Sequence, residues 1–212
     1  FTDETGKVTV GQMAQNQGVI QPENMISSSK TYIGNLELNQ TWTCNGRTYT
    51  PTDVAIEILR EVRRQFVKRV KLDENAEIGA VITVPTNFND NQRTEIRKAA
   101  EIAGFEILWL LEDSTAAAVE LFHDKPTDKK ILVVDIGGGT TEIAVISLGG
   151  ISASCSIRIG GDEMDSAIVQ YIKRMYNLMI GERTAEEIKM TIGTAIVTPE
   201  ADKTMAIRGR DL

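Results

Sequence analysis

The chain has 212 residues, of which 42% are hydrophobic and 25% are charged, and its formal net charge is -7 at pH 7. This length allows one large domain or two small ones, and the composition is that of a globular protein rather than a fibrous or disordered one. The negative charge repels nucleic acids and anionic lipid surfaces, so no nucleic-acid partner is expected.

The two cysteines, Cys44 and Cys155, belong to no zinc or disulfide pattern. No apolar run approaches the ~20 residues that a membrane span requires. These features predict a cytoplasmic location and no integral membrane segment.

Residues 1–40 are polar and predict only short strands and a helix, and the first strong helix signal comes at residue 50. Thr50 suits the N-cap, Pro51 the first helical position and Asp53 the first turn. One apolar residue in four then predicts a buried stripe, which consists of Val54, Ile58, Val62, Phe66 and Val70. The basic residues of the other face have no interleaved aromatic residues and are expected to be solvated. They are Arg60, Arg63, Arg64, Lys68, Arg69 and Lys71.

Three apolar runs predict strands that are buried on both faces. They are residues 78–84, 105–108 and 131–134. A helix between the first two runs should begin at Asn89 or Asp90 and stop at Gly104 in the left-handed conformation. Its inward residues should be Ile96, Ala99, Ala100 and Ile102. A small-residue helix at 114–119 then completes a strand-helix-strand-helix order, which predicts an α/β fold.

A glycine-rich turn follows the third run, with Gly137, Gly138 and Gly139 in succession. Residues 142–148 after it are strand-like, so the glycines lie at a hairpin tip. This argues against Rossmann and P-loop sites, because both need a helix behind the loop. Without Cβ atoms the turn can adopt positive φ, and its N–H groups can converge on a phosphate.

Polar side chains flank this turn. Asp135 ends the preceding strand, where its carboxylate is expected to hold the water shell of Mg²⁺. Thr140 and Thr141 add hydroxyls that can bond phosphate or water. The alternative is a glycine-rich hairpin with a structural aspartate, but turn geometry alone does not explain the three glycines, the aspartate and both threonines together.

Two further helices are predicted near the end of the chain. The first runs from about Glu163 to Tyr176. The second should have Thr184 as its N-cap, with Glu187 completing a capping box.

Residues 135–142 resemble the second phosphate motif of the actin superfamily, which implies an actin-like ATPase (ribonuclease H-like) fold. Residues 1–130 resemble the nucleotide-binding domain of DnaK-type heat-shock chaperones, which makes them part of lobe I. The matching stretches include 10–12, 22–24, 32–34, 80–85, 88–90 and 115–118.

Residues 131–212 are instead similar to MreB-type bacterial actins and would form part of lobe II with the phosphate-binding hairpin. The matching stretches include 134–142, 158–162, 180–182 and 208–210. The two likenesses indicate either a divergent member or a chimera. The first phosphate loop is expected before Phe1 and an adenine motif after Leu212, so the chain is expected to be an incomplete fragment with weak nucleotide binding and negligible turnover.

The resemblance implies roles for residues in the first part. Lys30 matches the chaperone lysine that reaches the γ-phosphate and the attacking water. Asp113 stands where chaperones carry a glutamate, and Ser114 replaces the proline after it, so a shorter carboxylate is expected to slow hydrolysis. Pro85 and Arg93 match an interlobe switch, although a strand terminator and a solvated arginine explain them equally well.

The resemblance also assigns residues on the nucleoside side. Glu186 and Lys189 match positions that clasp the ribose and adenine, and their i,i+3 spacing places them on one helix face. Leu108 and Trp109 occupy the strand where chaperones carry the basic residues that dock J-domain co-chaperones. That partnership is therefore not expected.

The main functional interpretation is the ATP-hydrolysing core of a DnaK-type chaperone, with ATP/ADP and Mg²⁺ as cofactors and a separate domain that binds unfolded clients. Its catalytic residues would be Lys30, Asp113 and Asp135. The alternative is an MreB-type ATPase that self-associates into filaments and sets cell shape, which the insertion-free stretch between Gly161 and Glu186 favours. A third interpretation is a nucleotide-binding module that has lost catalysis.

Overall fold

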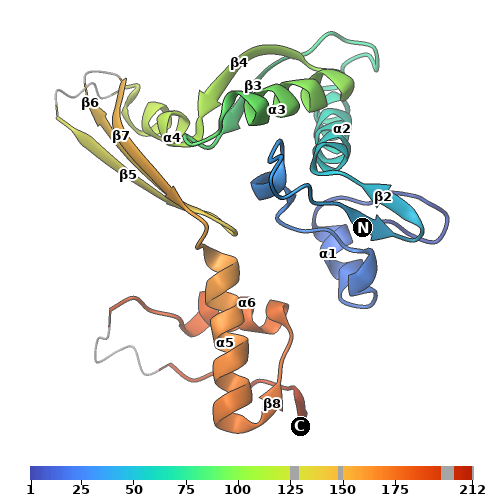
Figure 1. Cartoon of the computed structure of the whole chain (residues 1–212), viewed down its shortest axis with the longest axis vertical. Coiled ribbons are helices and arrows are strands. Elements are labelled where there is room, and N and C mark those ends of the chain that lie inside the picture. The colour runs from blue at the N-terminus through green and yellow to red at the C-terminus, as the bar shows by residue number, and fades with distance from the viewer. Residues whose placement is uncertain (125–128, 148–149, 197–202, 212) are drawn as a thin grey trace. The chain divides into compact units, whose positions relative to one another are not determined.

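The computed structural model describes residues 1–124, 129–147, 150–196 and 203–211 (Figure 1). The chain divides into two compact units, one of Phe1–Val133 with Ala144–Cys155 and one of Val134–Ile143 with Ser156–Leu212. The assignment of 1–130 and 131–212 to two lobes stays a prediction.

The first unit begins with short elements, as the polar sequence predicts. They are the helix α1 (Gln12–Gly18), the 3₁₀ helices η1 (Pro22–Asn24) and η2 (Ser29–Tyr32), and the strands β1 (Trp42–Cys44) and β2 (Arg47–Tyr49). The two strands form an antiparallel hairpin whose turn residues, Asn45 and Gly46, have φ of 46° and 76°. Asn-Gly is the usual pair for this turn, so the sequence carried a hairpin signal that the predictions above did not use.

The predicted N-cap of helix α2 (Pro51–Val70) is confirmed. The Thr50 hydroxyl accepts a hydrogen bond from the Asp53 N–H, and the Asp53 carboxylate accepts one from the Thr50 N–H. The prediction of the buried stripe is wrong, because the buried residues of α2 are Ile56 and Val67. Four of the five predicted stripe residues are exposed: Ile58, Val62, Phe66 and Val70. A strict spacing of four drifts around a 3.6-residue helix, so the stripe leaves the face that packs against the rest of the unit.

Arg63, one of the basic residues of α2 that were expected to be solvated, binds backbone oxygens of other segments. The Arg63 guanidinium donates to the backbone oxygens of Gly104, Glu74 and Ala76 at 3.1, 3.0 and 2.9 Å. It thereby ties α2 to the loop that follows it and to the turn at Gly104, which comes after the next helix.

Strands β3 (Gly79–Val84) and β4 (Glu106–Glu112) pair in parallel and alternate with helices α3 (Asp90–Ile102) and α4 (Asp113–Phe122). This confirms the predicted α/β order. A core cluster joins η2, β3 and α3 and consists of Ile33, Val84, Phe88 and Ile96. Figure 1 shows α3 alongside the two strands.

The prediction that the strands are buried on both faces is wrong for the described chain. Val81 of β3 and Leu108 and Trp109 of β4 are more than half exposed. In the third predicted strand, Leu132 and Val134 are also exposed. Burial on both faces requires a layer on each side of a sheet, whereas the contacts of β3 and β4 with helices leave these side chains uncovered.

The predicted course of α3 is largely correct. Asn89 forms a capping box with Gln92, and Gly104 after the helix has a φ of 92°. Three of the predicted inward residues, Ile96, Ala99 and Ala100, are buried. The fourth, Ile102, is 48% exposed, so that part of the prediction is wrong.

Three strands follow one another in a second sheet, in the order β5 (Ile131–Ile136), β6 (Thr141–Ser147) and β7 (Gly150–Ile157). The predicted strand after the glycines is confirmed as β6, and Leu148 lies outside the described residues.

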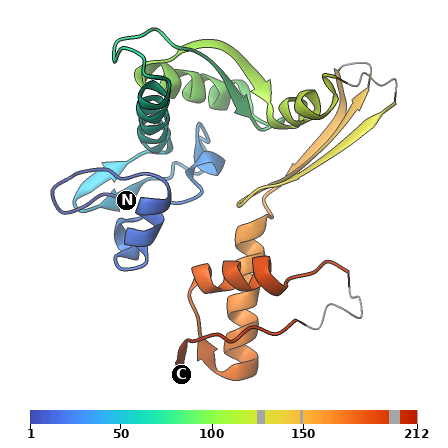
Figure 2. The same ribbon diagram turned by 180° about the vertical axis from the view of Figure 1, so that it is seen from behind.

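In the second unit, helix α5 (Gly161–Tyr176) packs against helix α6 (Glu182–Ile192), as both views show (Figure 2). Strand β8 (Leu178–Met179) pairs antiparallel with β9 (Arg210–Asp211). The predicted N-cap at Thr184 is wrong, because α6 begins at Glu182 after an extended Gly181. An acidic residue in the first turn interacts favourably with the helix dipole, which supports this earlier start.

Candidate functional site

The glycine turn is a tight hairpin tip between β5 and β6. The Gly137 N–H donates to the Thr140 oxygen at 2.8 Å and closes the turn. Asp135, near the end of β5, is exposed. At Gly137 and Gly138, φ lies outside the left-handed region, so the turn does not use the positive φ that glycine permits at these two residues.

Close backbone approach explains why glycines are needed here. The Gly161 N–H donates to the Gly137 oxygen at 2.9 Å, and the Asp162 N–H donates to the Gly138 oxygen at 2.8 Å. A Cβ on Gly160 would lie 2.4 Å from the Gly138 oxygen and 2.6 Å from the Gly137 oxygen. The start of α5 therefore lies directly against the carbonyl side of the hairpin, at a distance that only glycine permits.

This contact decides which hairpin groups stay available to a ligand. The carbonyls of Gly137 and Gly138 are occupied by the first N–H groups of α5. Within the described ranges, the N–H groups of Gly138 and Gly139 donate no turn or loop hydrogen bond. Successive free backbone N–H groups in a turn are well suited to bind an anion.

The two threonines differ in their surroundings. The Thr141 hydroxyl donates to the Ile159 oxygen at 2.7 Å, which fastens β6 to the segment before α5. Thr140 is half-buried at the tip of the hairpin. The Thr141 hydroxyl, one of the two predicted to bond phosphate or water, thus already donates a hydrogen bond within the protein.

Lys189, one of the two predicted nucleoside contacts, binds the start of α5, which also holds the hairpin. Its Nζ donates to the Asp165 carboxylate at 2.8 Å and to the Gly161 oxygen at 3.0 Å. The side chains of Lys189 and Asp165 are only 22% and 11% exposed. Glu186, one turn earlier on α6, is exposed.

Two of the predicted catalytic residues meet in the first unit. Lys30 Nζ lies 3.1 Å from the Asp113 carboxylate, although 83 positions separate them in sequence. The Lys30 side chain is 50% exposed, so the pair adds at most about 1 kcal/mol to stability. Ser114 beside it is fully buried, and its hydroxyl has no hydrogen-bond partner in the structure.

The predicted switch residues are linked through Phe88. The Phe88 N–H donates to the buried Pro85 oxygen at 3.1 Å, and the Arg93 Nε donates to the Phe88 oxygen at 3.1 Å. Arg93 also donates to the Glu112 carboxylate at 3.2 Å. Arg93 is therefore not merely solvated, and it connects the end of β3 to the residue before Asp113.

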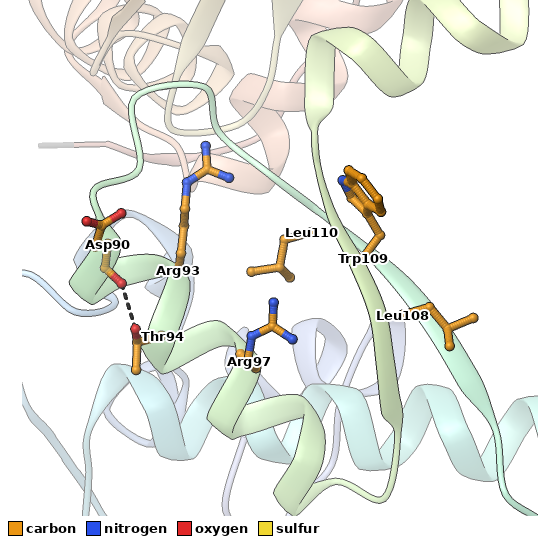
Figure 3. A pocket seen from close by; sticks show the side chains of 7 residues that line it. All are labelled: Asp90, Arg93, Thr94, Arg97, Leu108, Trp109 and Leu110. Atoms are coloured by element: carbon orange, nitrogen blue, oxygen red, sulfur yellow. Dashed lines mark hydrogen bonds between the residues drawn. The ribbon is translucent and has the colours of Figure 1, made fainter.

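A hollow of about 540 Å³ lies between α3 and β4 (Figure 3). Its lining includes Arg93 and Arg97 of α3, and it also includes Leu108, Trp109 and Leu110 of β4. The apolar side chains of Leu108 and Trp109 give no support to a J-domain contact.

Sequence reasoning missed several residues of the hairpin support. Gly160 and Asp162 entered only through a resemblance, although a glycine pair before a helix signals close approach. Asp165 carries no signal, because one acidic residue on an amphipathic helix normally predicts a solvated position.

Comparison with known proteins settles the family. A model of the family described as "MreB/Mbl protein" matches residues 50–212, well over half of the chain. The chain belongs to the MreB/Mbl family. It is 45% identical over 136 residues to the cell shape-determining protein Mbl of Bacillus cereus, covering 62% of this chain and 39% of that protein. It is 39% identical over 157 residues to the cell shape-determining protein MreB of Escherichia coli K12, covering 73% and 45%.

Solved MreB structures confirm the actin-like ATPase fold. MreB5 of Spiroplasma citri bound to ADP has a TM-score of 0.73 at 26% identity, and the match covers 100% of this chain and 59% of that one. The same protein bound to AMPPNP has a TM-score of 0.72.

The likeness to chaperones is also confirmed. The chain is 32% identical to the chaperone protein DnaK of Methanothermobacter thermautotrophicus, over 93% of this chain and 35% of that protein. The family match and the higher identities nevertheless favour the MreB alternative over the chaperone interpretation. The chain spans 39% to 45% of the length of the MreB and Mbl relatives.

No helix in the described ranges is long and apolar enough to cross a membrane.

Proposed function

We propose that the full-length protein is an actin-like ATPase of the MreB/Mbl type, which binds ATP, assembles into filaments and takes part in determining cell shape. The observation that carries the proposal is the glycine hairpin held against the start of α5, with the N–H groups of Gly138 and Gly139 left for a phosphate. The printed names of the relatives and the ADP and AMPPNP complexes of MreB5 support it.

The hairpin residues fit the phosphate part of a nucleotide. Gly137, Gly138 and Gly139 present backbone rather than side chain, and Thr140 adds a hydroxyl at the tip. Backbone N–H groups bind phosphate oxygens without any change of protonation.

Asp135 fits a hydrated Mg²⁺ ion rather than a protein cage. No group of three or more His, Cys, Asp or Glu side chains that could hold a metal occurs in the described residues. Mg²⁺ commonly keeps several waters and takes one or two carboxylates together with phosphate oxygens. One exposed carboxylate beside a phosphate site meets that requirement, and the ion would neutralise phosphate charge.

Hydrolysis of the γ-phosphate depends on positioning and charge stabilisation more than on covalent chemistry. We assign the orientation of the attacking water to Asp113, with Lys30 as its charged partner. Glu186 and Lys189 remain candidate contacts for the nucleoside. Pro85 and Arg93 remain a candidate interlobe switch.

A DnaK-type chaperone core remains the second candidate, favoured by the alignment with DnaK over 93% of this chain. The two candidates differ in what the nucleotide controls. A filament protein changes its assembly with ATP, whereas a chaperone changes its affinity for unfolded clients.

An ATP-dependent sedimentation assay on the full-length protein tests the proposal. We expect pelleted filaments with Mg-ATP and a loss of pelleting in Asp135→Asn, because the carboxylate that would hold the metal waters is gone. Asp124→Asn, which changes an exposed aspartate outside the hairpin, is the matched control and should pellet normally. A protein that stays in the supernatant and binds an unfolded peptide more weakly with ATP would establish the chaperone instead.

A further inference from the structure

The Lys30–Asp113 ion pair joins two segments that are far apart in the sequence. Lys30 lies in η2, before the stretch 50–212 that the family model matches, whereas Asp113 is the first residue of α4. Their contact at 3.1 Å therefore depends on how accurately both segments are held. The first turn of α3 binds a chain neighbour of each residue.

On the Asp113 side, the support comes from Arg93. Its guanidinium donates to the carboxylate of Glu112, the residue before Asp113, at 3.2 Å. It also donates to the Phe88 oxygen at 3.1 Å, just before the start of α3. The end of β4 is thereby tied to the start of α3.

On the Lys30 side, the support is a close contact between Gly34 and α3. The side-chain amide of Asn91 donates to the Gly34 oxygen. Gly34 has a φ of 60°, and a Cβ added to it would lie 2.6 Å from the Cα of Gln92 and 2.9 Å from the backbone nitrogen of that residue. Only glycine lets the chain pass α3 at this distance and with this backbone conformation.

Gly34 is coupled to Lys30 through the 3₁₀ turn of η2. The Ile33 N–H donates to the Lys30 oxygen at 3.4 Å, and the Ile33 side chain is buried in the core with Phe88 and Ile96. A displacement of Gly34 from α3 would therefore shift η2. Because the Lys30 side chain is half exposed, the position of η2 rather than side-chain packing sets where its ammonium lies.

We propose that Gly34 and Asn91 are positioning residues for ATP hydrolysis, because they fix η2 on α3 and so hold the Lys30 ammonium at Asp113. The inference rests on the proposed function, in which Asp113 orients the attacking water and Lys30 is its charged partner. Gly34 and Asn91 touch none of the reacting atoms in this assignment, and both act through Lys30.

ATP turnover and ADP binding by the full-length protein separate positioning from a general loss of the site. Gly34→Ala should lower kcat by roughly ten- to a hundredfold, because small misplacements of a catalytic group have effects of that size. The ADP affinity, measured by calorimetry, should stay the same, because the Lys30–Asp113 pair is assigned to the hydrolysis step. Equal losses in kcat and in ADP affinity would overturn the proposal.

Gly46→Ala is the matched control for the backbone conformation. Gly46 also has a left-handed φ, of 76°, but no atom of the described residues lies within 4 Å of the added Cβ. This variant should therefore carry the same kind of backbone strain as Gly34→Ala and keep the wild-type kcat. An equal loss of kcat in both variants would assign the effect to strain and overturn the proposal.

A double-mutant cycle with Lys30→Met tests whether Gly34 acts through Lys30. Lys30→Met alone should lower kcat, and Gly34→Ala added to it should lower kcat no further. A second loss of similar size in the double variant would contradict the proposal. So would an unchanged kcat in Lys30→Met, because the positioned group would then have no part in the reaction.

Asn91→Asp provides the test should Gly34→Ala fail to fold. It keeps the size of an exposed side chain but loses the amide donor, and an acidic residue in the first turn of a helix is stabilising, so the free energy of unfolding should not fall. We expect kcat to fall roughly two- to tenfold, as for the loss of one hydrogen bond. Asn91→Gln keeps an amide donor and should recover part of that loss. A wild-type kcat in Asn91→Asp would remove Asn91 from the proposal.

Lysine acetylation without nucleotide tests the positioning independently of the proposed function. Lys30 should react faster with acetic anhydride in Gly34→Ala and in Asn91→Asp than in the wild type, because its amine is released from the ion pair. Lys173, exposed on α5, is the internal control and should react equally in all three proteins. Peptide mass spectrometry after timed labelling measures both rates. An unchanged Lys30 rate would overturn the positioning role, whereas a faster rate in a protein that hydrolyses no ATP would overturn the proposed function alone.

Discussion

Gly160 is the residue with the least space for a side chain next to the hairpin. Gly160→Ala would place a Cβ 2.4 Å from the Gly138 oxygen and force the backbones apart. We expect a loss of about 1–3 kcal/mol in the free energy of unfolding, the usual cost of overpacking, and weaker ATP binding.

Gly150→Ala provides the comparison, because no atom lies within 4 Å of the added Cβ and the glycine has no left-handed φ. Urea denaturation of both full-length variants measures the difference. Equal stabilities would mean that the hairpin can move away from α5 at no cost.

Asp113 allows a separate test of catalysis. Asp113→Asn should lower the ATP hydrolysis rate and change the free energy of unfolding by at most about 1 kcal/mol, because its partner Lys30 is half exposed. Asp113→Glu, with the longer carboxylate, should hydrolyse ATP faster than the wild type. A slower Asp113→Glu would show that the site is built around the shorter side chain.

The pairing of Lys30 with Asp113 could be anticipated only through a family resemblance. Residues 83 positions apart leave no local pattern, and the contact depends on where the tertiary fold places η2 and the start of α4. The same holds for Lys189, whose spacing from Glu186 suggested a shared face. The structure pairs the Lys189 ammonium with Asp165 of α5, a contact that this spacing does not predict.

The starts of α2 and α3 follow local chemistry closely. Thr50→Ala and Asn89→Ala each remove a capping box and should cost about 1 kcal/mol. Thr50→Ser keeps the hydroxyl and should retain most of the stability. Thermal unfolding of the three variants measures these effects, and an unchanged Thr50→Ala would show that the Thr50 cap adds nothing.

Glu61 on α2 predicts an acid-sensitive contribution to helix stability. Hydrogen bonds from Arg64, and then from Gln65, lower the pKa of the Glu61 carboxyl to about 2. A lowered pKa means that the stabilisation is complete above the ordinary carboxyl range and is lost as pH falls from about 4 to 2. Wild type and Glu61→Gln should therefore differ in unfolding midpoint at pH 6 and converge near pH 2. A difference that persists at pH 2 would contradict the assignment.

Element order and the N-caps of α2 and α3 were therefore predictable, whereas the start of α6 and the burial of the strands were not. Thr50, Asn89 and Gly104 act through their immediate neighbours, and the structure confirms all three. The exposure of Val81 and Trp109 depends on which layers cover a sheet, which an apolar run does not specify.

The two cysteines report on the folding of the whole chain. Cys44 is buried, and desolvation raises the pKa of its thiol, whereas Cys155 is exposed. Because the thiolate is the reactive form, Cys155 should react quickly with a maleimide at pH 7.5 while Cys44 stays protected until the protein unfolds. Mass spectrometry of peptides after timed labelling measures both. Fast labelling of Cys44 in the native protein would contradict the packing of the β1–β2 hairpin.

Helix α5 is bonded to the hairpin at its first turn, so a small rotation there would move its far end. Its 16 residues correspond to a rod of about 24 Å, with the glycine carbonyls fastened at one end and β8 following the other. A tilt of roughly 5° at the fastened end would displace the far end by about 2 Å, given that length. A bound phosphate that tilted α5 by this amount would break no hydrogen bond at the hairpin. The same tilt would shift the far end of α5 by a distance typical of a packing rearrangement.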